Sequence, residues 1–158
     1  MNATPGPVIN AARIDILDLL GRYADAVMRS DQDDWIDCWG SNPTWNRGGQ
    51  IVSGRNALLE TWHDIRRRYT PVVHTIHPGR IAVRNGSARG RCTVQELLKC
   101  EDGSARQVVG VYHDDFEPAD VGWRFQSRRF DMLMSRAIDL GNAELRSWPA
   151  GLEDFIDR

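Results

Sequence analysis

Apolar residues recur with the period of an α-helix along the first part of the chain. Between Asn10, a possible N-cap, and Arg29 they form one stripe over about five helical turns, with charges on the opposite face. A second, short helix is expected at Asp31, whose carboxylate can accept from the backbone N–H groups of a first turn. After Gly54 the apolar positions return at helical spacing up to Tyr69, which predicts a third amphipathic helix.

From residue 72 onward the apolar period changes to two, which predicts strands. Asn85-Gly86 and Asp102-Gly103 separate alternating segments and are typical of hairpin turns. Helices that precede a run of antiparallel strands indicate an α+β fold. A short final helix is expected over 137–145. The expected strands are 72–77, 80–84, 88–100, 105–116 and 123–133, besides a small hairpin around Gly48-Gly49.

Length and charge limit the classes of protein that the chain can represent. Its 158 residues fit one domain, divided into a lead-in over 1–9, a core domain over 10–135 and a C-terminal extension over 136–158. Lys and Arg total 20 against 22 Asp and Glu, which argues against a nucleic-acid binder. No apolar run approaches the roughly 20 residues of a membrane span and no secretory pattern opens the chain, so we expect a cytoplasmic protein.

Cysteine usage points to the same compartment. The three cysteines are an odd number, and their spacing matches no zinc or redox motif. Reduced and mostly buried thiols are therefore expected. They are Cys38, Cys92 and Cys100.

Several short motifs occur in a particular order along the chain. They include ILDL and RYA on the first helix, HTIH at the start of the strands, and GVYHDDF followed by GWRF near the end. Together they resemble the SnoaL-like branch of the nuclear transport factor 2-like superfamily, over roughly residues 10–135. The resemblance implies a cone, in which a strongly curved mixed β-sheet wraps around a pocket that three N-terminal helices close. It also implies catalysis without a metal or an organic cofactor, a small hydrophobic or aromatic substrate, and a homo-oligomer, either trimer or dimer.

The same resemblance assigns a general base to the HTIH motif. His77 falls where dehydratase-type members place their catalytic histidine, whereas His74 should point to the other face of an extended strand. These members also carry an aspartate on the first helix that orients the histidine, and here Met28 occupies its position. Glu96 can replace it if the strand register turns Glu96 inward; in the other register Gln95 faces the pocket.

Two further residues match catalytic positions of the family. Tyr23 falls where members donate a hydrogen bond to a substrate oxygen or leaving group. Arg128 falls where a dehydrochlorinase-type arginine stabilises a departing anion, although a register shift of one residue would exchange it with Arg129. The substrate pocket is expected to be lined by Met28, Trp45, Trp62, Cys92, Tyr112 and Phe130.

These residues predict a cofactor-independent lyase or isomerase that uses general acid–base chemistry. The alternative is a non-catalytic binding or assembly module, like the small β subunits of aromatic-ring dioxygenases, which the loss of the helical aspartate at Met28 favours. Hydrolysis of an epoxide is a third possibility, but it needs more inward-facing carboxylates than the chain offers.

Overall fold

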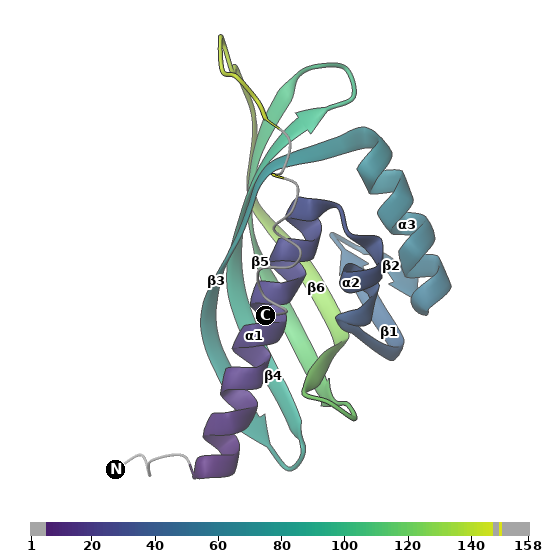
Figure 1. The fold of residues 1–158 in the computed structure, drawn as a ribbon, viewed down its shortest axis with the longest axis vertical. Coiled ribbons are helices and arrows are strands. Elements are labelled where there is room, and N and C mark those ends of the chain that lie inside the picture. Colours follow the sequence, from purple (N-terminus) through teal and green to yellow (C-terminus); the bar gives the residue numbers. More distant parts are fainter. Residues whose placement is uncertain (1–5, 147–148, 150–158) are drawn as a thin grey trace.

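The computed structural model describes residues 6–146 and 149 of the chain. It has the predicted α+β architecture, with a curved mixed sheet whose concave side is covered by helices from the N-terminal half (Figure 1). The sheet has six strands in the order β2-β1-β6-β5-β4-β3. The elements are α1 (Pro7–Arg29), α2 (Gln32–Asp37), β1 (Trp39–Arg47), β2 (Gln50–Ser53), α3 (Arg55–Arg68), β3 (Tyr69–Arg84), β4 (Ser87–Cys100), β5 (Ala105–Pro118) and β6 (Trp123–Ile138).

The long first helix begins earlier than its apolar stripe indicates. Gly6 is the N-cap and the helix starts at Pro7, so the prediction of Asn10 as the cap was wrong. Proline suits a first turn because the N–H that it lacks has no helical partner there. At the other end, Ser30 adopts a left-handed conformation with φ 59° and ends the helix.

The second helix begins where the sequence predicts. The Asp31 side chain accepts from the backbone N–H of Asp34 at 2.9 Å, which confirms its capping role. Two arginines of α1 hold α2 in place, because Arg22 binds Asp34 and Asp37 while Arg29 binds Asp34. These half-exposed ion pairs fix the angle between the two helices at one end of the sheet.

The four long strands form the expected antiparallel meander, and β1 joins it by running parallel to β6. The strands predicted at 72–77 and 80–84 are one strand, β3, because Pro78 and Gly79 form an irregularity in its pairing with β4 instead of a turn. Pro71 lies within β3. A proline is accommodated there because β3 is an edge strand, which needs hydrogen-bond partners on one side only.

The C-terminal helix predicted over 137–145 is wrong. Strand β6 continues to Ile138, where it pairs with Ala105 of β5, and residues 139–146 contain no helix. Hydrogen bonds to the neighbouring strand outweigh the local helical preference of this segment. The rest of the predicted extension lies outside the described residues, apart from residue 149. In the part of the chain that the structure describes, no helix is long and apolar enough to cross a membrane.

The core is dominated by aromatic side chains between the helices and the sheet. Trp35 of α2 stacks on Trp62 of α3 with ring centroids 4.5 Å apart, and it contacts Trp39 of β1 edge to face at 5.5 Å. Tyr23 of α1 contacts Phe125 of β6 at 5.4 Å. These rings connect all three helices to the sheet and thereby fix the walls of the space between them.

Gly110 on β5 is required by the packing of Phe130 from the neighbouring strand. A Cβ added at Gly110 would lie 2.1 Å from Phe130 Cε2 and 2.9 Å from the backbone oxygen of Asp131. We expect Gly110→Ala to lower the free energy of unfolding by about 1–3 kcal/mol, because the ring has to move. Urea denaturation checks this value.

Gly21 offers a matched control for this substitution. It lies inside α1 with nothing within 4 Å of an added Cβ, so Gly21→Ala should raise the free energy of unfolding by about 0.5–1 kcal/mol. Equal urea midpoints for Gly110→Ala and the parent protein would show that Phe130 is not packed against this glycine.

Candidate active site

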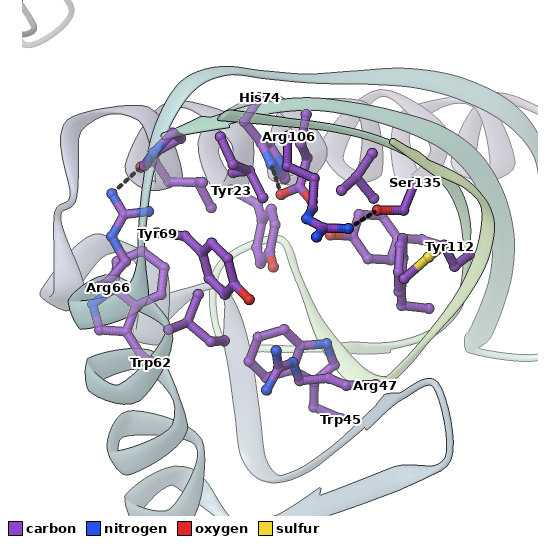
Figure 2. A pocket seen from close by; sticks show the side chains of 18 residues that line it. Tyr23, Trp45, Arg47, Trp62, Arg66, Tyr69, His74, Arg106, Tyr112 and Ser135 are labelled. Carbon is purple, nitrogen blue, oxygen red and sulfur yellow. Dashed lines mark hydrogen bonds and ion pairs between the residues drawn. The ribbon is translucent and has the colours of Figure 1, made fainter. Parts of the chain in front are cut away.

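A cavity lies between α1, α3 and the concave face of the sheet (Figure 2). Its volume is about 290 Å³, enough for a small organic molecule. Aromatic and aliphatic side chains form most of its wall, and a few charged groups interrupt them. The lining residues are Tyr23, Val27, Trp45, Arg47, Trp62, Ile65, Arg66, Tyr69, Pro71, His74, Glu96, Leu98, Arg106, Val108, Tyr112, Phe130, Met132 and Ser135.

One wall of the cavity carries a histidine–carboxylate pair. His74 of β3 lies directly opposite Glu96 of β4, and its Nδ1 is 2.8 Å from Glu96 Oε1. The histidine is 4% exposed, and its Nε2 is buried without a hydrogen-bond partner among the described residues. With an ionised Glu96, Nδ1–H donates to the carboxylate and the lone pair lies on Nε2. The pair therefore presents an oriented base.

The structure places His74, and not His77, in the cavity wall. The prediction that His77 faces the pocket is wrong, because its side chain is exposed and does not line the cavity. Residues 74 and 77 lie on opposite faces of one continuous strand, since side chains alternate along it. Of the two registers that the sequence leaves open, the structure has the one in which Glu96 lines the cavity and Gln95 is exposed. Glu96 on an apolar face was the signal in the sequence that should have selected its cross-strand partner His74.

Met28 does not line the cavity, contrary to prediction. Its Sδ instead lies 3.1 Å from the backbone nitrogen of His74, which donates to it. The thioether thus touches the strand next to the base but cannot orient its ring. The carboxylate that orients His74 comes from the neighbouring strand β4 and not from the helix.

Arg128 is the most deeply buried charge near the cavity. Its Nε and Nη2 donate to the two carboxylate oxygens of Asp114 at 2.8 and 2.9 Å, and both side chains are at most 1% exposed. The guanidinium carbon lies 4.0–4.3 Å from the ring centroids of Tyr23, Tyr112 and Phe125. Arg128 is thus inward and Arg129 is exposed, but Arg128 lies behind the tyrosines and not in the cavity lining.

Two tyrosines separate this ion pair from the cavity. Burial raises the pKa of Tyr23 and of Tyr112 above the ordinary value of 10.0, although the Arg128 charge acts in the opposite direction. Both phenols therefore keep their protons at neutral pH and are available as hydrogen-bond donors. Tyr23 lines the cavity, and its ring centroid lies 6.0 Å from that of His74.

All four aromatic residues predicted for the pocket wall line the cavity, whereas the predicted Met28 and Cys92 do not. Trp45, Trp62, Tyr112 and Phe130 line the cavity. Cys92 does not, because it is buried beneath the floor with Sγ 3.9 Å from Asp114 Oδ2.

Sequence reasoning missed several polar lining residues: Arg47, Arg66, Tyr69 and Arg106. They lie on four different elements, and no local pattern marks them as neighbours.

The fold and this cavity define the class of the protein. Residues 10–129 match the family model of the SnoaL-like domain, so the chain belongs to the SnoaL-like family. No curated protein matches the chain in sequence.

Solved structures agree with this assignment. A type 2 hexachlorocyclohexane dehydrochlorinase superposes with a TM-score of 0.77 at 18% identity, covering 90% of this chain and 96% of its own. A protein of unknown function from Mycobacterium tuberculosis gives 0.70 at 24% identity, covering 77% and 76% of the two chains. A candidate scytalone dehydratase from Novosphingobium aromaticivorans gives 0.68 at 17% identity, covering 85% and 97%. At such identities the likeness establishes the fold alone.

Loss of the buried Arg128–Asp114 ion pair should strongly lower the free energy of unfolding. Asp114→Asn leaves the Arg128 charge without a counterion, and we expect it to lower the free energy of unfolding by about 3–5 kcal/mol. The matched control is Asp115→Asn on the outer face, where Asp115 pairs with the exposed Arg89; this change should cost less than about 1 kcal/mol. Chemical denaturation measures both. Equal, small losses would contradict the structural role of the pair.

The thiols provide a second check on the described core. Burial raises the pKa of Cys38 and of Cys92 to about 12, so both remain protonated at pH 8, whereas Cys100 is only half-buried. A thiol reagent such as Ellman's should therefore titrate one cysteine in the native protein at pH 8 and all three in denaturant. Rapid reaction of all three without denaturant would contradict this packing.

Proposed function

We propose that the protein is a cofactor-independent lyase that removes a proton from an activated C–H bond of a small hydrophobic or aromatic molecule. The observation that carries the proposal is the contact of 2.8 Å between His74 Nδ1 and Glu96 Oε1 in the wall of the cavity. Glu96 holds the imidazole in one tautomer and stabilises its protonated form. The folds of a hexachlorocyclohexane dehydrochlorinase and of a candidate scytalone dehydratase support an elimination reaction.

In the proposed reaction His74 Nε2 takes the proton, and the electron pair of the broken C–H bond forms the new double bond. The leaving group departs from the adjacent carbon; when it is a hydroxyl, the imidazolium returns the proton to it and water is released. Tyr23, kept neutral by burial, donates a hydrogen bond to a substrate oxygen as negative charge develops there. Arg128 stabilises this charge from behind the phenol ring. Return of the proton to a different carbon would give an isomerase.

A binding or assembly module is the second candidate, and Met28 is the observation that favours it. The thioether contacts the backbone of His74 and supplies no charge to the imidazole. In this alternative the His74–Glu96 pair is only a polar contact of the cavity wall.

The proposal also includes a trimeric or dimeric assembly and a cytoplasmic location, which rest on the sequence and its resemblance.

Substitution of the two histidines separates the proposed base from its neighbour on the strand. We expect His74→Ala to slow deuterium incorporation from D2O into 2-tetralone, and elimination of water from scytalone, at least about 100-fold, because a general base is lost. Glu96→Gln should slow both about 10-fold or more, because the imidazolium loses its counterion. His77→Ala is the matched control and should change neither rate, since His77 is exposed. Proton NMR follows both reactions.

Two outcomes would contradict the lyase proposal. Rates that equal the buffer rate for the parent protein, together with binding of both compounds, would support the binding module. Loss of activity in His77→Ala and not in His74→Ala would move the chemistry to the other face of β3.

A further inference from the structure

The cavity lining contains more positive charge than its own residues neutralise. Arg47 of β1, Arg66 of α3 and Arg106 of β5 line it, whereas Glu96 is its only carboxylate among the described residues and is engaged with His74. None of the three guanidinium groups forms an ion pair with any described carboxylate. The buried Arg128, in contrast, is matched by Asp114. The cavity thus has a positive lining of guanidinium groups from three separate elements.

Arg47 is the least satisfied of the three. Its side chain makes no hydrogen bond within the described residues, and its guanidinium carbon lies 5.0 Å from the ring centroid of Trp45. Burial lowers the pKa of Arg47, because its charge is partly removed from water, although Glu96 acts in the opposite direction. Arg66 differs, because its Nη2 donates to the Val27 carbonyl at 3.2 Å and to the Ser30 hydroxyl. Arg66 therefore also joins α3 to the end of α1.

Arg106 reaches the cavity from β5, whereas Arg47 reaches it from β1. Its Nη1 donates to the Ser135 hydroxyl at 2.9 Å, which leaves its remaining N–H groups without protein partners in the described chain. Figure 2 shows the side chains of Arg47 and Arg106 entering the same space from different sides. A planar guanidinium recognises a carboxylate through two parallel hydrogen bonds.

We propose that the cavity selects an organic acid, with the substrate carboxylate held by Arg47 and Arg106 and the apolar body directed toward His74. This inference deepens the proposed function by naming the substrate class. Charge distribution supports the orientation, because the Glu96 carboxylate beside His74 repels an anion while the two arginines attract it. The walls formed by Trp45, Trp62 and Phe130 fit an aromatic or alicyclic body.

Matched acids and amides of the same shape test the proposal without turnover. Calorimetry at low ionic strength should show benzoate and naphthoate binding at least about 10-fold more tightly than benzamide and naphthamide, as expected for charge-assisted hydrogen bonds. Added salt should weaken the acids more than the amides. Arg47→Gln and Arg106→Gln should each remove most of the difference, and Arg47→Lys should restore part of it.

Arg84→Gln is the matched control, because Arg84 is exposed at the end of β3 and does not line the cavity. It should leave acid binding unchanged, and thermal unfolding verifies that every variant is folded. Equal binding of acids and amides, no binding of either acid, or acid binding that persists in both the Arg47 and Arg106 variants would overturn the inference.

Failure of this inference is distinguishable from failure of the lyase proposal. His74→Ala should still bind naphthoate in preference to naphthamide, because the base does not contact the carboxylate. Acid selectivity without any catalysis of proton removal would leave an acid-binding module. Catalysis by His74 without acid selectivity would leave a lyase for neutral substrates.

Discussion

The ion pair between Arg128 and Asp114 is the interaction on which the interior of this protein depends. Two charges removed from water are tolerated only when each finds its partner, and here both oxygens of Asp114 receive an N–H. The remaining faces of the guanidinium contact the rings of Tyr23, Tyr112 and Phe125, which come from α1, β5 and β6. A single arginine thus ties the first helix to the middle of the sheet. The floor of the cavity consists of the same tyrosines, so its shape follows from this contact.

The cavity contains a second set of charges, arranged on a different principle. His74 and Glu96 are neighbours across the β3–β4 pairing, and the carboxylate makes the imidazole a directed base. In contrast to Arg128, the lining arginines Arg47 and Arg106 have no carboxylate partner among the described residues. A buried charge with a counterion gives rigidity, whereas a charge in a cavity without a counterion gives affinity for an anion. The cavity therefore has a rigid floor above the Arg128–Asp114 pair, and a lining in which Arg47 and Arg106 are free to bind an anion.

Met28 lies on the first helix beside the proposed base but carries no charge that could orient it. A methionine on the first helix still contacts β3 beside the base, through the backbone nitrogen of His74. The orienting charge comes instead from Glu96, one strand away. Paired residues of adjacent strands lie directly opposite one another, so the Glu96 carboxylate on β4 reaches the imidazole of His74 on β3. The proposed catalytic pair is thus a property of strand register.

The sequence by itself determined the fold class, the three helices, the antiparallel meander and the cap at Asp31, because these follow from local periodicity and turn chemistry. It left two registers open at Glu96, and only the structure shows that Glu96 lines the cavity. Period-two alternation also predicted that His74 and His77 lie on opposite faces of their strand, but it did not indicate which of them lines the cavity. Only the pairing of β3 with β4 decided that, since it places His74 opposite Glu96. Likewise Arg47 and Arg106 line the same cavity only because β1 and β5 belong to one curved sheet. Local pattern sets which face a side chain takes, whereas contacts between distant segments set what it meets there.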